Sequence, residues 1–390
     1  MSTTSRGSGP HVLRRLNASA VLTALRTGGP QRVADLMDRT GLTRPTVTQA
    51  LTLLERAGWI SPVHGTADVT AAPRKGRPAQ LVSFRAGAGC LVGADVGPHK
   101  AIVMITDLIG APLAELRVST GSAGDGPELI TLIADTVRAA LARAGRTEDE
   151  VYAVCIGSPG IADPENRTFR LAPSIPGWAS LPLDAELGRM FRCPVLVEND
   201  VNLSVLAERW QGVATDAATV LFVHWGSRIG AGLVVGGRLH RGVGGAAGEI
   251  GFIDLDETPP VVGGMGPLER VVGADAIGRL GGGAFPDSGA VLRAAADGDP
   301  AALTAIDEIA ARFARGLAPA LLVLDPELVV IGGGVSRGGP PLLAALERHL
   351  RPRTLVPPRL ALSALGDRAG VLGAIRACLD NLEATLAASL

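Results

Sequence analysis

Short aliphatic runs recur between residues 91 and 336, and most of them end in glycine-rich or polar turns. Helical segments alternate with these runs, as in the amphipathic stretch 129–144. Aliphatic strands that alternate with helices are typical of α/β units with a largely parallel sheet. The runs form two series, which begin at Leu91 and at Thr219. The sequence therefore predicts an α/β body of two lobes with a cleft between them.

A polar cluster directly follows the aliphatic strand 195–197. Ligands of open α/β sheets bind at the carboxyl ends of strands, so we expect Asn199, Asp200 and Asn202 to face a ligand. Carboxylates and amides supply the acceptors and donors that a hydroxyl-rich molecule needs. The alternative is a plain strand-to-helix turn in which Asp200 or Asn202 caps the helix.

Charge is divided unevenly along the chain. Residues 1–84 carry 11 Lys and Arg against 4 Asp and Glu, a net charge of +7, and the rest carries 26 against 34, a net charge of −8. Such asymmetry indicates a nucleic-acid-binding end joined to a body that does not bind nucleic acid. The alternative is an incidental basic surface.

The basic segment has the pattern of a helix-turn-helix. Asn17 is expected to cap a first helix, and Pro30 suits the first turn of a second. Gly41 then makes a tight corner, and Thr43 caps a third helix that Gly58 ends. Helix, helix, glycine turn and helix together predict a DNA-binding head, although a three-helix domain that binds protein has the same pattern.

The third helix is the expected reader of DNA, because the first residues of a recognition helix reach base edges. A basic tip between two short strands would form a wing suited to a narrow minor groove, or else only a solvated linker. The residues expected to contact DNA are Arg44, Thr46, Thr48 and Gln49 of the helix, and Arg74, Lys75 and Arg77 of the wing.

Cysteine usage and hydropathy indicate the compartment. Cys90, Cys155, Cys193 and Cys378 are too far apart in sequence for a metal knuckle, and most lie in apolar contexts typical of core residues. No segment resembles a signal peptide or a membrane span. We therefore expect a cytoplasmic protein that does not associate with a membrane.

These features together resemble the ROK family (repressors, open reading frames and sugar kinases), in its repressor branch. The resemblance covers the chain from Asn17 to about Leu379 and implies a winged helix-turn-helix followed by a two-lobed actin/hexokinase-like (ribonuclease H-like) sugar-kinase fold, an α/β fold. The motifs that carry it are Thr-Gly-Leu-Thr-Arg-Pro-Thr-Val at 40–47, Gly-Arg-Pro at 76–78, Pro-Gly-Trp at 176–178, Glu-Asn-Asp-Val-Asn at 198–202, Gly-Ala-Ala-Gly-Glu-Ile-Gly at 245–251 and Ile-Gly-Gly-Gly-Val-Ser at 331–336.

The resemblance implies boundaries for these parts. A disordered tail is expected over residues 1–11, the DNA-binding domain over 12–84 and the sugar-kinase-like domain over 88–390. Its small lobe would comprise about 88–200 plus the C-terminal helix, and its large lobe about 201–370.

The resemblance also implies a sugar site. Kinases of the family hold the hexose with residues that match Asn199, Asp200, Glu249 and Glu269, and Ser174 stands where an Asn is common. The Asp is the catalytic base of those kinases. The same side chains suit sugar hydroxyls without catalysis, so they support sugar binding and do not by themselves support phosphoryl transfer.

Other positions depart from the family pattern. The four zinc-ligand positions are occupied by Phe252, Pro260, Val262 and Pro267, none of which can ligate zinc through its side chain. We expect no metal and no cofactor. The loss of the His at 252 is expected to alter ligand choice.

The phosphate turns depart as well. Pro98 removes an N–H donor, His99 replaces a hydroxyl, and Arg228 replaces a glycine. The sequence therefore predicts a sugar-responsive transcriptional regulator, most simply a repressor, that binds a double-stranded operator as a homodimer or homotetramer and does not phosphorylate its effector. The alternatives are an active sugar kinase with a DNA-binding head, and a DNA-binding protein whose cleft is vestigial.

Overall fold

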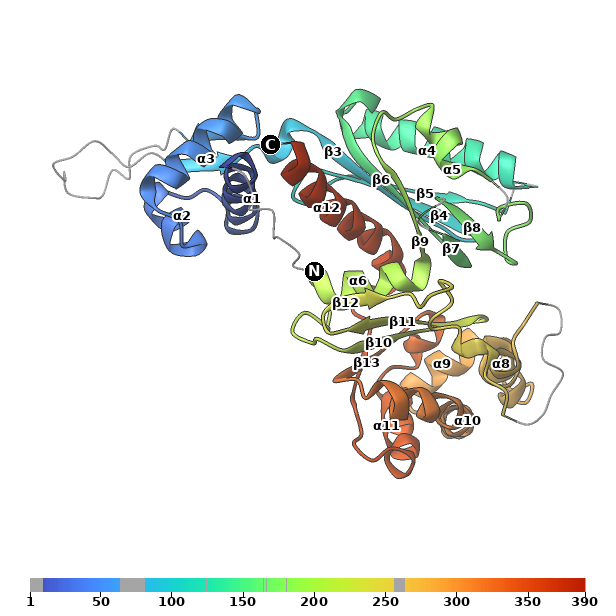
Figure 1. Cartoon of the computed structure of the whole chain (residues 1–390). Helices are drawn as coiled ribbons and strands as arrows, with labels where there is room; N and C mark the ends of the chain where they lie inside the picture. The colour runs from blue at the N-terminus through green and yellow to red at the C-terminus, as the bar shows by residue number, and fades with distance from the viewer. Residues whose placement is uncertain are drawn as a thin grey trace, which may run out of the picture.

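The computed structural model of the chain describes residues 10–63, 81–121, 123, 125–163, 165, 167–179, 181–255 and 264–389. Figure 1 shows a helical head beside an upper α/β lobe, with a second α/β lobe below. This arrangement confirms the predicted winged helix-turn-helix followed by a two-lobed α/β body.

The described part of the head is a helix-turn-helix with a short antiparallel sheet. Gly41 has a φ of 68° and its N–H donates to the carbonyl of Met37, which closes the corner before the third helix. Thr43 occupies the N-cap position of that helix, as expected. The elements are α1 (Pro10–Gly28), α2 (Val33–Thr40), α3 (Arg44–Arg56), β1 (Ile60–Val63) and β2 (Leu81–Phe84).

Two local expectations for the head were wrong. α1 begins at Pro10, so Asn17 lies inside the helix instead of capping it. The run of leucine and arginine that precedes Asn17 favours helix and extends α1 upstream. Pro30 does not start α2, because Gln31 pairs with Val82 of β2 through two backbone hydrogen bonds of 2.9 Å. That bridge holds the chain extended until α2 starts at Val33.

The upper, small lobe has a five-stranded sheet in the order β5-β4-β3-β6-β9. β3 and β6 run parallel, as do β6 and β9, so their carboxyl ends meet at one edge. One face of the sheet packs on α4 and the other on α12. The elements are β3 (Cys90–Val96), β4 (Lys100–Thr106), β5 (Pro112–Ser119), α4 (Gly126–Arg143), β6 (Val151–Ser158), β7 (Ile161–Asp163), β8 (Thr168–Leu171), α5 (Leu183–Gly188), β9 (Val195–Asn199) and α12 (Ala369–Ser389).

The lower, large lobe has a second five-stranded sheet, in the order β12-β11-β10-β13-β14. Its core lies between this sheet and a layer of helices in which α10 is the longest. The elements are β10 (Val220–Trp225), β11 (Ile229–Val235), β12 (Arg238–His240), α7 (Pro267–Val272), α8 (Ala274–Leu280), α9 (Ser288–Ala296), α10 (Pro300–Leu324), β13 (Leu328–Gly332), α11 (Gly339–Leu350) and β14 (Arg359–Leu362).

Helix α6 (Asp200–Gln211) lies at the boundary of the two lobes (Figure 1). Val201 and Val205 pack on the face of the large-lobe sheet that is opposite its layer of helices. Leu203 and Ala207 pack instead with α12 in the core of the small lobe. The helix that follows the polar cluster is therefore shared between the lobes, so a change at its first residues can reach either one.

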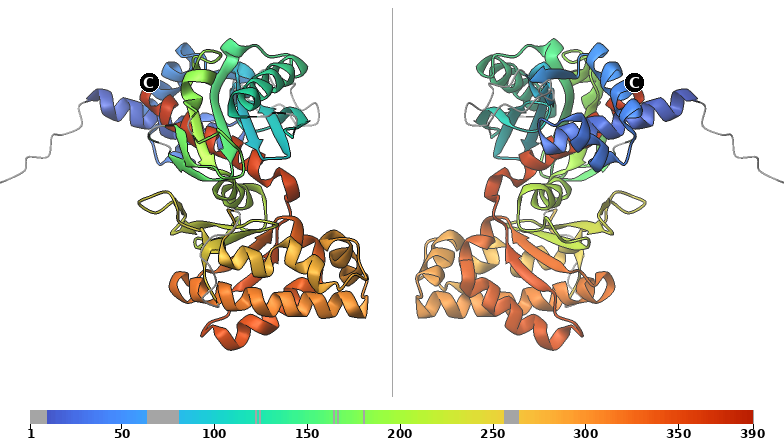
Figure 2. Two further views of the ribbon diagram at one scale, coloured as in Figure 1. Left: turned by 90° about the vertical axis from the view of Figure 1, so that its right-hand side faces the viewer. Right: turned by 90° about the vertical axis from the view of Figure 1, so that its left-hand side faces the viewer.

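The head and the small lobe share one hydrophobic core. Buried side chains of α1, α2 and α3 form a single cluster with those of β3, β4 and α12. Figures 1 and 2 show α12 (red) passing from the lobe boundary up to α1 (blue). Trp59 adds an edge-on contact with Tyr152 of β6, at 5.3 Å between ring centroids. The head therefore packs directly against the small lobe and is not joined to it only by a linker.

Arg26 of α1 closes this interface. Its side chain is only 6% exposed and pairs with Glu383 of α12 at 3.1 Å. It also donates to the carbonyl of Leu108 and lies over the ring of Phe84, 5.8 Å from the centroid. One side chain thus binds the head to both the small-lobe sheet and its last helix.

The cysteines of the described part form no disulfide, and Cys90, Cys155 and Cys378 are buried as expected for core residues. No helix among the described residues is both long and apolar enough to cross a membrane.

Candidate ligand site between the lobes and candidate nucleic-acid interface

Asn199 is the N-cap of α6. Its Oδ1 accepts the backbone N–H groups of Val201 at 2.9 Å and Asn202 at 3.0 Å, and its Nδ2 donates to the carbonyl of Gly160 at 2.9 Å. The cap is therefore Asn199 and not Asp200 or Asn202. No described residue accepts the second proton of its amide, which is the group that Asn199 can offer a ligand.

Asp200 is the first residue of α6 and is half-buried at the lobe boundary. Burial raises the pKa of its carboxyl, while the nearby imidazole of His224 and the N–H of Val201 lower it. His224 lies on β10 of the large lobe, so the two lobes influence each other electrostatically through Asp200. His224 could not be predicted as part of the site, because it is a lone histidine in an apolar strand.

Glu249 lies opposite Asp200, on the loop that follows β12. Burial raises the pKa of its carboxyl, and the negative charges of Glu269 and Asp200 raise it further. Asp95, at the end of β3, belongs to the same group, because burial and the charge of Asp200 raise its pKa to about 7. The structure thus brings together three of the predicted residues and adds Asp95, which was not among the residues predicted to bind sugar.

The carboxylate of Glu269 is occupied by hydrogen bonds within the protein. Its side chain is 6% exposed, and its two oxygens accept the backbone N–H groups of Ile229 at 2.9 Å and Gly266 at 2.8 Å. Arg228 pairs with it at 3.3 Å and also donates to the carbonyl of Gly264. Glu269 fixes the start of α7 against the Arg228 turn, and little of its acceptor capacity remains for a ligand.

Ser174 lies in the turn between Ala172 and Trp178 and is half-buried. Trp178 is buried in the core of the small lobe and fixes this turn against it. Among the described residues, no hydrogen bond joins Ser174 to the other four predicted sugar-binding residues.

The two turns that match the phosphate turns of the family's kinases each use a backbone donor within the turn. The N–H of Gly97 donates to the carbonyl of Lys100 at 2.9 Å, and the N–H of Gly226 donates to the carbonyl of Arg228 at 3.0 Å. Thr120 further ties down the first turn by donating to the carbonyl of Gly97 at 2.8 Å. Both turns are therefore internally closed.

In a third turn, close packing explains why residue 333 is a glycine. Its φ is 79°, and a Cβ there would lie 2.5 Å from the carbonyl oxygen of Trp225. The glycine at 333 is therefore explained without a ligand.

Two of the four residues at the zinc-ligand positions, Pro260 and Val262, lie outside the described residues. Phe252 is 45% exposed, and Pro267 is buried at the start of α7. Within the described ranges, no group of three or more His, Cys, Asp or Glu side chains could hold a metal ion.

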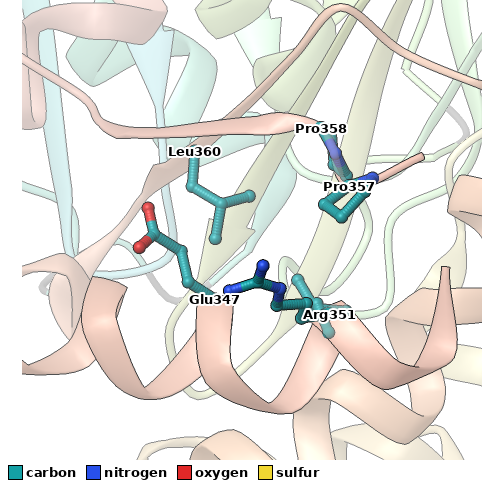
Figure 3. A pocket seen from close by; sticks show the side chains of 6 residues that line it. Glu347, Arg351, Pro357, Pro358 and Leu360 are labelled. Carbon is teal, nitrogen blue, oxygen red and sulfur yellow. The ribbon is translucent and has the colours of Figure 1, made fainter. Parts of the chain in front are cut away.

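A hollow of about 350 Å³ lies elsewhere on the large lobe, between α11 and β14 (Figure 3). Glu347 of α11 and Arg351, directly after that helix, face Leu360 and the two prolines that precede the strand. No predicted sugar-binding residue lines it, and we assign it no role.

The exposed face of α3 carries the residues predicted to read DNA. Arg44, Thr48 and Gln49 are exposed and Thr46 is half-buried. The hydroxyl of Thr48 donates to the carbonyl of Arg44. The methyl group of Thr48 and the side chain of Gln49 are therefore the groups that these two residues present to solvent. The wing residues Arg74, Lys75 and Arg77 lie outside the described residues.

A groove between α1 and α3 adds residues that the sequence reasoning missed. It has a volume of about 330 Å³ and lies beside Gln49. Arg14 and Asn17 of α1 and Arg56 of α3 line it. The basic surface therefore extends from the recognition helix onto α1.

Two families divide the chain between them. Residues 91–380 match the ROK family, and residues 15–68 match the MarR family. The chain belongs to the ROK family. As the motifs predicted, a helix-turn-helix head of MarR type precedes the ROK domain.

Relatives of both kinds are similar to this ROK protein. A glucokinase of Halalkalibacterium halodurans is 31% identical over 72% of this chain and 92% of its own length. A xylose repressor of Caldicellulosiruptor bescii is 26% identical over 79% of this chain and 82% of its own length. The crystal structure of a ROK family transcriptional regulator, described as a homologue of the E. coli MLC protein, has a TM-score of 0.80 at 22% identity and covers 97% of this chain and 100% of its own.

Proposed function

We propose that this ROK protein is a sugar-responsive transcriptional regulator that binds operator DNA through its head and a sugar or sugar derivative between its lobes, without phosphorylating it. The observation that carries this proposal is the shared core of the head and the small lobe. Because the head packs on the lobe that contains Asn199 and Asp200, ligand binding at those residues can change the position of the head. The xylose repressor relative, which is 26% identical over 79% of this chain, supports the same function.

The proposed ligand site comprises Asn199, Asp200 and Glu249, with Glu269 and Ser174 supporting the walls. An effector that bridges the lobes changes the angle between them, and in a homodimer or homotetramer this changes the spacing of the heads. Paired recognition helices read half-sites about one helical turn apart, so spacing controls affinity. The effector acts only through its different affinities for the two arrangements.

The proposed absence of phosphoryl transfer rests on the phosphate turns. The N–H groups of Gly97 and Gly226 already donate within their own turns, and Pro98 has none. Arg228 is held by Glu269 over the second turn. The N–H groups of Gly97 and Gly226 could bind a triphosphate only if these two hydrogen bonds opened.

The test of the proposal is a gel shift with DNA from upstream of the protein's own gene, with D-xylose, D-glucose, amino sugars and their phosphates as effectors. We expect retardation at low salt and a change in affinity with at least one sugar. No retardation under any of these conditions contradicts the proposal. Retardation that no sugar alters favours a regulator whose ligand site is vestigial.

The Arg44→Ala and Arg77→Ala substitutions are expected to weaken DNA binding in different ways. Arg44 is expected to fork onto a guanine, so its loss should cost about 1–3 kcal/mol on the best operator and relax sequence preference. Arg77 is expected to contact the backbone, so its loss should weaken binding to all sequences and flatten the salt dependence. Fluorescence anisotropy over a salt series on operator and scrambled DNA measures both. Wild-type affinity in both variants would place the DNA surface elsewhere.

Asp200→Ala is expected to bind operator as tightly as the parent protein and to lose most of its response to the effector. Asp200 lies at the lobe boundary, far from the exposed face of α3, and its carboxylate is a natural partner for sugar hydroxyls. Operator titrations with and without saturating sugar measure the response. An undiminished response would remove Asp200 from the ligand site.

An active sugar kinase is the second candidate, and the 31% identity to a glucokinase favours it, as does Asp200 as a potential base. Coupled ADP release over a panel of sugars tests it. Steady turnover that Asp200→Asn abolishes would establish the kinase and reverse our ranking.

A further inference from the structure

One ion pair crosses the lobe boundary beside the proposed ligand site. Arg241 follows β12 of the large lobe, and its Nε donates to Oε2 of Glu198 on β9 of the small lobe at 2.6 Å. The Glu198 side chain is 5% exposed and that of Arg241 is 43% exposed. The carboxylate is thus fixed in the protein, whereas the guanidinium can leave it for water.

Glu198 holds the first turn of α6 in place. Its Oε1 accepts the N–H of Asn199 at 2.9 Å and Nδ2 of Asn202 at 2.9 Å. Arg241 is the only cation hydrogen-bonded to it among the described residues. A buried carboxylate that loses its charged partner is strongly disfavoured, so the position of Asn199 depends on Arg241 through Glu198.

Arg241 begins a loop that touches the small lobe a second time. Its carbonyl accepts the N–H of Ala247 at 3.1 Å, which closes residues 241–247 into a compact unit. Gly245, with a φ of 75°, lies so close to β7 that a Cβ would be 2.9 Å from the carbonyl oxygen of Ala162. Glu249 comes two residues after this loop. Movement of the loop therefore moves Glu249 relative to Asp200.

We propose that Arg241 is a positioning residue that latches the two lobes: its pair with Glu198 orients Asn199 and Asp200 and holds Glu249 opposite them. A ligand that contacts Asp200 and Glu249 bridges the same two lobes as the ion pair does. Ligand binding and latch closure therefore favour each other, even though Arg241 need not touch the ligand. The coupling to ligand rests on the proposed sugar site, whereas the latch itself does not.

The latch is tested first without ligand. Nitroxide spin labels are placed on Thr131→Cys in α4 and Thr304→Cys in α10, both exposed, in a Cys193→Ser background. Double electron–electron resonance then measures the distance between lobes. We expect one narrow distribution in this parent and an added longer, broader population in Arg241→Gln. Arg241→Lys keeps the charge and should restore most of the narrow population.

Arg238→Gln is the matched control, because it removes an exposed arginine three positions earlier on β12. It should leave the distribution unchanged. If Arg241→Gln also has the parent distribution, the latch is overturned. Glu198→Gln removes the same ion pair from the other side, and a normal distribution in this variant would likewise overturn it, provided that thermal melts show both variants folded.

The coupling is tested by calorimetry with D-xylose and D-glucose. We expect Arg241→Gln to bind the effective sugar about tenfold more weakly, a change of about 1.4 kcal/mol, with Arg238→Gln within twofold of the parent. Parent-like affinity in Arg241→Gln overturns the coupling to ligand. If the parent binds neither sugar, that result counts against the proposed function for these two sugars, and the distance measurement still decides the latch.

Discussion

Leu382→Ala is expected to lower the midpoint of thermal unfolding by roughly 2–6 °C, from a loss of about 2–5 kcal/mol for a buried leucine. Leu382 lies on α12, is 1% exposed and belongs to the core that the head shares with the small lobe. The cavity would loosen α1 as well as the small-lobe sheet. We therefore expect operator affinity to fall too, although α12 is not part of the recognition surface.

Thermal melts followed by circular dichroism and anisotropy titrations with operator DNA measure these two effects. Leu355→Ala makes the same truncation at a leucine that is 93% exposed and should change neither quantity. A variant with a lower melting midpoint but parent-like operator affinity at a temperature where it is folded would show that the head is independent of α12.

Asp95→Asn is expected to stabilise the protein at pH 8 by up to about 4 kcal/mol, since each unit of pKa shift corresponds to about 1.4 kcal/mol. Burial and the charge of Asp200 raise the pKa of Asp95 from 3.8 to about 7. Between those values the folded chain holds a proton that the unfolded chain releases. The parent protein therefore loses stability as the pH rises through this window, whereas asparagine stays neutral throughout.

Urea unfolding at pH 4, 6 and 8 measures this effect. The difference in unfolding free energy between Asp95→Asn and the parent should be near zero at pH 4 and should grow to pH 8. Asp216→Asn, at an exposed aspartate, is the control and should show no such trend. A difference that is the same at all three pH values would mean that Asp95 does not take up a proton on folding.

Much of the fold was accessible from the sequence because its signals are local. Thr43 occupies the N-cap position of α3 and the glycine at 41 makes the corner before it, and both follow from rules that span a few residues. The strand that ends at Asn199 was recognisable from its aliphatic run and the polar residues after it. The order of strands and helices then indicated two α/β lobes.

The functions of individual polar side chains were harder to predict. Asn199 was expected to face a ligand, but most of its hydrogen bonds cap α6. Glu269 was expected to bind sugar, but it holds the Arg228 turn and the start of α7. A sequence motif gives the residue type at a site and not the number of its hydrogen bonds that the protein itself takes up.

Interactions between distant segments were beyond sequence reasoning altogether. Arg241 and Glu198 come from different sheets, and Arg26 meets Glu383 from the opposite part of the chain. Each charge looks like an ordinary surface residue in its local sequence. Only the three-dimensional packing reveals that these pairs join the lobes and the head.

The pairing of α1 with α12 has a consequence for synthesis on the ribosome. The head is translated early, but the helix that completes its core follows both lobes, about 300 residues later. Contacts between segments so far apart form slowly, because a long loop must close first. A nascent chain would thus carry its recognition helix unsupported until α12 emerges, and competence to occupy an operator would be acquired only by the finished molecule.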